Sequence, residues 1–158
     1  MLDLQKLLSD EEISLLNKLG HSELVASQTY LHLSICMKNK GFFGAEKFYM
    51  NESNDERTHY SKLADFMNDM GEELKVLPLD GVDTESESLM DSFEFAYNME
   101  AQLLRDYEEA YQVVSVKTKI FLQEMIDIQV KAVGEYGDLI ARLSLTGEPI
   151  LIDQELGE

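Results

Sequence analysis

Four long segments of this chain carry apolar residues at steps that alternate between three and four. Such spacing keeps one face of an α-helix toward its neighbours, so each segment is predicted to form one helix of a bundle. The first two helices are predicted over residues 10–40 and 42–70. The third carries its apolar positions over residues 89–114, and the fourth carries them over residues 122–143 and ends near Gly147.

Residues at the helix ends support these boundaries. Ser9, with Glu12 three positions later, has the form of a capping box and would start the first helix. Gly41 and Gly71 stand where the first and second helices should stop, because glycine readily adopts the conformation that ends a helix. The links between the first and second helices, and between the third and fourth, are therefore short.

Two segments fall outside the four helices. Residues 72–87 contain Pro78, Gly81 and a run of acids and serines, which predicts a long crossover between the second and third helices. Residues 149–158 begin with an apolar run and predict a short fifth helix that docks on another surface, such as a neighbouring subunit. The sequence thus predicts one all-α domain over residues 1–158, with a four-helix bundle at about residues 10–146.

Charge and composition exclude several classes of protein. The 158 residues include 31 acidic and 13 basic side chains, for a formal charge of −18. Nucleic acids and anionic membranes both require a basic face, so neither is an expected partner. The one cysteine, Cys36, cannot form an internal disulfide, and no apolar stretch reaches the length of a membrane span. The first residues do not resemble a signal peptide, so a soluble, cytoplasmic protein is expected.

Each apolar stripe is interrupted near its middle by a polar residue. Mid-helix positions meet at one height in a bundle, so these side chains should converge in the core. Buried carboxylates are strongly unfavourable unless positive charge compensates them, and no lysine or arginine lies on the stripes. A metal ion is the simplest source of that charge. The interrupting residues, from the first helix to the fourth, are Glu23, Glu56, Glu100 and Gln129.

A histidine in the second helix strengthens the metal prediction. Glu56 and His59 lie three residues apart on one helix face, where both can reach the same ion. Carboxylate and imidazole ligands without thiolates suit iron or manganese, and two ions with bridging carboxylates would balance the negative charge. The alternatives are a buried polar network without metal and, for Gln129 alone, a hydrogen bond across the core. Glu52, one turn before Glu56, is either an outlying ligand or a solvated acid.

Four segments of the chain and its tail resemble the ferritins, and this resemblance extends over almost the whole chain. In the first helix, Glu23 and Tyr30 are similar to the ligand and the tyrosine that the family places seven residues apart. The fourth-helix segment is similar to heavy-chain-type animal ferritins, whereas the tail is more similar to bacterial ferritins. The matching segments are residues 23–30, 54–59, 97–101 and 129–138, with the tail at residues 142–156.

The resemblance implies a role for each residue of the set. Glu56 would be the carboxylate that bridges two irons, and His59 the single histidine ligand. Gln129 would be a weak ligand or a residue that holds the ligands in place. Tyr30 would be a redox-active neighbour, hydrogen-bonded to a ligand. The iron ligands implied are Glu23, Glu56, His59 and Glu100.

Departures from the family pattern exclude some of the metal and haem sites found in other ferritins. A bacterioferritin would repeat the Glu-x-x-His motif on the fourth helix, but Gln129 and Ala132 stand there. Neither the bacterioferritin site nor haem is therefore expected. The acids that bacterial ferritins often place on this helix for a third iron are also missing, so a third site of that kind is not expected. Asp55 replaces a glutamate of the family and, with Glu52, is a candidate accessory ligand.

The resemblance also implies a function. The chain would oxidise Fe(II) with O2 at a centre of two irons per subunit and store Fe(III) as mineral inside a homo-oligomeric cage of twenty-four subunits. One alternative is a cage subunit with little oxidase activity, although inactive animal light chains lack ligands that this sequence retains. The other is a rubrerythrin-like di-iron peroxidase, which would need a further glutamate–histidine motif and an iron-binding cysteine domain.

Overall fold

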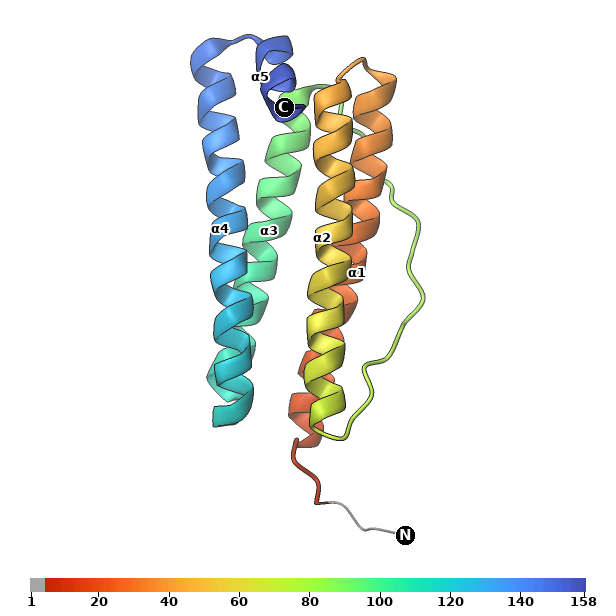
Figure 1. Cartoon of the computed structure of the whole chain (residues 1–158), viewed down its shortest axis with the longest axis vertical. Coiled ribbons are helices and arrows are strands. Elements are labelled where there is room, and N and C mark those ends of the chain that lie inside the picture. The colour runs from red at the N-terminus through yellow and green to blue at the C-terminus, as the bar shows by residue number, and fades with distance from the viewer. Residues whose placement is uncertain (1–4) are drawn as a thin grey trace.

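The computed structural model describes residues 5–158 and consists of helices, short turns and one long connection (Figure 1). The four long helices lie side by side, and a short helix packs against two of them at one end of the bundle. The predicted all-α architecture is confirmed within these residues. The helices are α1 (Asp10–Asn39), α2 (Phe43–Asp69), α3 (Leu89–Val113), α4 (Val116–Thr146) and α5 (Pro149–Leu156).

The order of the helices requires a crossover connection. α1 and α2 form one antiparallel hairpin, and α3 and α4 form a second (Figure 1). Because α2 and α3 run in the same direction, the chain has to return along the length of the bundle between them. Residues 70–88 make this return beside α1 and contain neither helix nor strand. The predicted crossover is therefore confirmed.

The apolar stripes form two buried clusters at different heights. One cluster combines α1 positions up to Leu19 with Leu63, Leu103 and Leu122 of the other long helices. The other cluster starts at Tyr30 in α1 and takes in the opposite halves of the other helices. The middle of each long helix lies between these clusters, where the polar residues interrupt the stripes. The core thus consists of two apolar layers around one polar layer.

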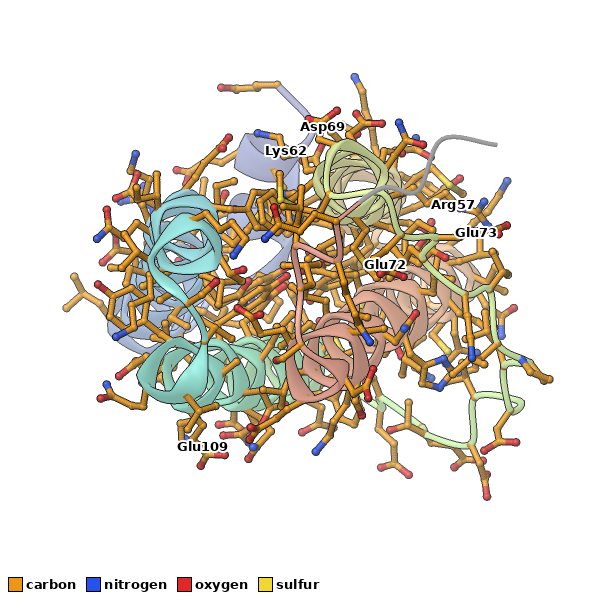
Figure 2. All side chains as sticks on the ribbon, turned by 90° about the horizontal axis from the view of Figure 1, so that it is seen from below. Arg57, Lys62, Asp69, Glu72, Glu73 and Glu109 are labelled. Atoms are coloured by element: carbon orange, nitrogen blue, oxygen red, sulfur yellow. The ribbon has the colours of Figure 1, made fainter. Side chains whose placement is uncertain are left out.

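Charged side chains surround the outside of the bundle, as the end-on view shows (Figure 2). Arg57, Glu73 and Glu109 lie at the periphery in that view. One surface ion pair joins α2 to α4, where Lys62 Nζ donates to Glu124 Oε1 at 2.6 Å. None of the helices within residues 5–158 has the length and apolar character that crossing a membrane requires.

The predicted helix ends are confirmed. At the start of α1, Glu12 N donates to Ser9 Oγ at 3.1 Å and Ser9 N donates to Glu12 Oε2 at 2.9 Å. Gly41, Gly71 and Gly147 follow α1, α2 and α4 with φ values of 88°, 77° and 61°. These are left-handed conformations that glycine adopts without strain, so each glycine ends its helix.

Glu12 also reaches the start of α4. Its Oε1 accepts hydrogen bonds from the Ser115 N–H at 2.7 Å and from the Thr118 hydroxyl at 3.1 Å, and Ser115 is the N-cap residue of α4. Burial on its own would raise the pKa of Glu12, but the hydrogen bonds from Ser115, Ser9 and Thr118 lower it to about 2. One buried carboxylate therefore joins the beginnings of α1 and α4.

α5 completes the N-terminus of α2, whose own cap residue, Phe42, makes no side-chain cap. The buried Asp153 of α5 accepts hydrogen bonds from the Gly44 N–H at 3.2 Å and the Ala45 N–H at 2.7 Å. Residue 44 has to be glycine, since a Cβ there would lie 1.8 Å from the Asp153 main-chain oxygen. α5 thus docks on α2 of its own chain. The sequence predicted that this helix docks but did not identify the surface.

The contact between α5 and α2 gives a first prediction. We expect Asp153→Ala to lower the free energy of unfolding by about 1–2 kcal/mol, because α2 loses its N-terminal hydrogen-bond acceptor. Urea denaturation followed by circular dichroism measures this change. The matched control is Asp65→Ala, on the exposed face of α2 without a hydrogen bond among the described residues. Equal stability of the two variants would show that α5 does not cap α2.

A second prediction concerns pH and Glu12. Because the pKa in the folded chain, about 2, lies below the ordinary value of 4.5, ionised Glu12 stabilises the fold above pH 4.5. This contribution is lost as the pH falls toward 2. We expect Glu12→Gln to be less stable than wild type at neutral pH by on the order of 3 kcal/mol, and the difference to shrink in acid.

Urea titrations at several pH values between neutral and strongly acidic measure the Glu12 effect. Glu11→Gln changes an exposed neighbour and serves as the control, with no comparable trend expected. A difference between wild type and Glu12→Gln that stays constant across this pH range would contradict the proposed role of the carboxylate.

Candidate metal centre

The polar residues that interrupt the four stripes meet in the middle of the bundle. Glu23 of α1, Glu56 of α2, Glu100 of α3 and Gln129 of α4 are each no more than 2% exposed. Rigid mid-helix backbone positions them, and the apolar clusters above and below shield them from water. Three carboxyl groups and one amide therefore share the polar layer of the core.

Ligand atoms in this layer form two groups with the spacing of metal sites. In the first group, here called the histidine site, one atom each from Glu23, Glu56 and His59 lies within 4.8 Å of the others. The second, here called the carboxylate site, consists of Glu52, Glu56 and Glu100 with the same limit on distance. Glu56 belongs to both sites. The two positions are therefore adjacent and share one carboxylate.

In the histidine site, the imidazole lies against two carboxylates. His59 Nδ1 is 3.5 Å from Glu23 Oε2 and 3.4 Å from Glu56 Oε2. Both distances exceed the roughly 2.9–3.0 Å of a typical nitrogen–oxygen hydrogen bond. Glu23 Oε2 is buried and has no hydrogen-bond partner in the described part of the chain. The imidazole alone therefore does not satisfy the carboxylates around it.

Two buried tyrosines orient the outer carboxylates from the neighbouring hairpin. Tyr107 of α3 donates to Glu23 Oε1 at 2.6 Å, and Tyr30 of α1 donates to Glu100 Oε1. Each tyrosine lies seven residues after the glutamate of its own helix and bonds to the glutamate of the other helix. Helical side chains lean toward the N-terminus, which carries each hydroxyl back to mid-helix.

Tyr107 is the residue of this centre that the sequence prediction missed. It appeared there only as an apolar position of the third helix. A signal was present, since Tyr107 follows Glu100 at the same seven-residue spacing that separates Tyr30 from Glu23. That spacing shows the tyrosine's height in the bundle but does not identify the carboxylate that it contacts.

The other predicted residues differ in their placement. Gln129 donates through Nε2 to the Glu100 carboxylate and, at 3.0 Å, to the Glu100 main-chain oxygen. These two hydrogen bonds hold Glu100 in place. Asp55 is exposed and lies outside both groups, whereas Glu52 is part of the carboxylate site.

No basic side chain neutralises these carboxylates within residues 5–158. The ion pairs of lysine and arginine there lie on the surface, and the ionisable nitrogen that approaches these carboxylates is His59 Nδ1. The cluster therefore carries more negative charge than its protein neighbours can balance. Burial makes such an excess costly, which favours a bound cation.

The shortage of positive charge also changes the pKa values of the cluster. Burial and the neighbouring Glu23 carboxyl raise the pKa of Glu56 well above its ordinary value. Burial and nearby acids raise the pKa of Glu52 to about 8. Burial would raise the pKa of Glu23 as well, but the neighbouring Glu56 carboxyl and His59 imidazole lower it. Without a cation, the cluster thus retains protons at neutral pH.

The donor atoms indicate which cations fit. Carboxylate oxygens with one imidazole nitrogen, and no thiolate, suit iron or manganese. The shared Glu56 provides for two ions side by side, as in the di-metal carboxylate sites of helical bundles. The geometry therefore describes a candidate di-metal centre in the core of the bundle.

Known proteins with this sequence pattern and fold are ferritins. The family profile for the ferritin-like domain matches residues 13–146. The bacterial non-heme ferritin of Escherichia coli is 27% identical over 158 residues, which cover 95% of this chain and 96% of the relative. The bacterial non-heme ferritin of Staphylococcus haemolyticus is 25% identical over 146 residues, which cover 90% of this chain and 88% of the relative.

Solved structures agree on the fold. An open pore ferritin from the hyperthermophilic archaeon Archaeoglobus fulgidus matches with a TM-score of 0.88 at 23% identity, covering 94% of this chain and 97% of the other. The family profile spans all four long helices and most of the chain. This chain therefore belongs to the ferritin family.

Proposed function

We propose that this chain is the subunit of an iron-storage ferritin that oxidises Fe(II) with O2 at Glu23, Glu56, His59 and Glu100. The observation that carries the proposal is that Glu56 belongs to two adjacent ligand groups. A shared carboxylate is what a pair of metal ions requires. The relatives named as bacterial non-heme ferritins support storage of iron, and the sequence favours a cytoplasmic location.

The chemistry follows from holding two iron ions at once. Each Fe(II) gives up one electron, so a bound pair supplies two electrons to one O2 molecule. The iron is the substrate, and the protein supplies position and charge.

Uncharged donors prepare the site for this reaction. Tyr107 orients Glu23, while Tyr30 and Gln129 orient Glu100. Because these donors are neutral, they fix the carboxylates in place without cancelling the charge that attracts Fe(II). Tyr30 donates to Glu100 of the carboxylate site, and we assign it the role of a redox-active neighbour of the ion there.

The two alternative functions fit the residues less well. A cage subunit without oxidase activity does not need buried metal ligands, yet this bundle contains Glu23, Glu56, His59 and Glu100. A rubrerythrin-like peroxidase would carry a second glutamate–histidine pair on α4, where Gln129 and Ala132 stand. Ferritin-type oxidation therefore remains the function that the geometry supports best.

Assembly into a hollow cage of twenty-four subunits is part of the proposal. Large apolar side chains are more than half exposed on several faces of the single chain, which is typical of surfaces that other subunits cover. Examples on α1, the crossover and α4 are Ile35, Val76, Ile120 and Leu145.

A bridging ligand should be indispensable, and Glu56 provides the direct test. We expect Glu56→Gln to slow aerobic Fe(II) oxidation at least about tenfold, because neither ion keeps its shared carboxylate. Stopped-flow absorbance of Fe(III) formation measures the rate. Glu94→Gln, an exposed change on α3, is the matched control. Oxidation by Glu56→Gln at the wild-type rate would rule out the proposed centre.

Assembly is tested by the mass of the particle in solution. We expect sedimentation velocity to give one large species with many times the mass of the 18.0 kDa chain, stable upon dilution. Electron microscopy of the same sample should show hollow particles. A stable monomer at micromolar concentration would contradict the cage.

A further inference from the structure

The carboxylate site contains one acid more than the proposed oxidation centre uses. Glu52 lies one turn before Glu56 on α2, and one of its oxygens is within 4.8 Å of oxygens of both Glu56 and Glu100. Two carboxylates four residues apart on a helix repel each other. Nothing among the described basic residues offsets this repulsion, because none forms an ion pair with Glu52.

Counting charges points to the role of this extra acid. Two Fe(II) ions bring four positive charges, while Glu23, Glu56 and Glu100 bring three negative charges. Ionised Glu52 supplies the fourth. A buried site is least costly when its charges cancel, so the four carboxylates together match two divalent ions.

An unpartnered hydroxyl provides an independent observation. Tyr136 of α4 is fully buried, and its hydroxyl makes no hydrogen bond to any residue from 5 to 158. The ring stacks on Tyr30 with a centroid distance of 6.2 Å and an interplanar angle of 12°. The hydroxyl lies beside the Glu52 carboxyl. A small movement of the Glu52 side chain would give this buried donor its acceptor.

Tyr136 then completes a pattern that the other ligands already follow. Glu23 accepts a hydrogen bond from Tyr107, and Glu100 accepts one from Tyr30. In each pair, the tyrosine comes from a different helix than the carboxylate that it orients. Glu52 and Tyr136 form a third pair of this kind, between α2 and α4.

We propose that Glu52 is a ligand of the second iron ion, positioned by Tyr136, so that three carboxylates hold this ion. The inference rests on the proposed two-iron function. Its consequence is that the two ion positions differ in chemistry, since the histidine site includes a nitrogen ligand and the carboxylate site has oxygen ligands alone. Oxygen-only sites favour hard ions such as Mn(II) over softer ones.

Counting bound ions under anaerobic conditions tests the inference directly. Isothermal titration of the assembled protein with Fe(II) should give two tightly bound ions per chain for wild type. We expect Glu52→Gln to retain one ion at wild-type affinity and to bind the second at least about tenfold more weakly. Glu94→Gln, on the surface of α3, should bind both ions as wild type does. Sedimentation velocity verifies that each variant assembles.

Tyr136→Phe provides a milder second variant, because it removes the hydroxyl and keeps the ring. It should weaken the second ion alone, by up to about tenfold, and leave two ions bound at saturation. In a parallel titration with Mn(II), Glu52→Gln should lose more affinity at the carboxylate site, which has no nitrogen ligand, than at the histidine site.

The outcomes separate this inference from the function on which it rests. If Glu52→Gln binds two ions with wild-type affinities, Glu52 is not a ligand. This holds even if oxidation by the variant slows when Fe(II) is limiting, because a residue that only passes iron toward the centre would have that effect. If wild type itself does not bind two ions, the two-iron function fails and the inference fails with it. If Glu52→Gln binds one ion tightly while wild type and Glu94→Gln bind two, the result supports both the two-iron function and the role of Glu52.

Discussion

Carboxylates packed into the core of a helical bundle, with no lysine or arginine to neutralise them, form the constraint on which this structure depends. Such groups are tolerated only if something else supplies positive charge or protons. The fold meets the condition by placing them at mid-helix, between two apolar layers that give the bundle its stability. The polar layer thereby holds the candidate metal centre, while the layers on either side hold the helices together.

The groups that contact the carboxylates are nearly all uncharged. Tyrosine hydroxyls and the Gln129 amide donate hydrogen bonds to Glu23 and Glu100. A lysine in their place would orient a carboxylate equally well but would also cancel its charge and weaken cation binding. Neutral donors therefore fix the geometry of the carboxylates without cancelling their negative charge.

Much of this architecture could be predicted from the sequence, because it depends on local patterns. The apolar spacing predicts the four helices, Ser9 and Glu12 predict the first helix start, and the polar interruptions predict the height at which side chains meet. Contacts between distant positions could not be predicted. Tyr107 and Glu23 are 84 positions apart, and each looks like an ordinary member of its own helix until the helices are packed.

Glu52 illustrates a different limit of the sequence. Its position on α2 places it on the same face as Glu56, but that position suits a solvated acid as well as a ligand. The distinction depends on how far α4 covers α2 and on where the side chain points, both of which are properties of the packed bundle. The docking surface of α5 could not be predicted for the same reason, since no local pattern links Asp153 to the start of α2.

The cap on α2 has a consequence for how the protein is made. α2 carries the shared ligand, yet the acceptor for its Ala45 N–H lies 108 positions later, in the last helix. During synthesis, α1 and α2 leave the ribosome long before Asp153 does, so their hairpin first exists with an uncapped end. The helix N-terminus becomes fully satisfied only when translation is nearly complete. A chain that stops before Asp153 would therefore carry α2 with two unsatisfied N–H groups at its first turn.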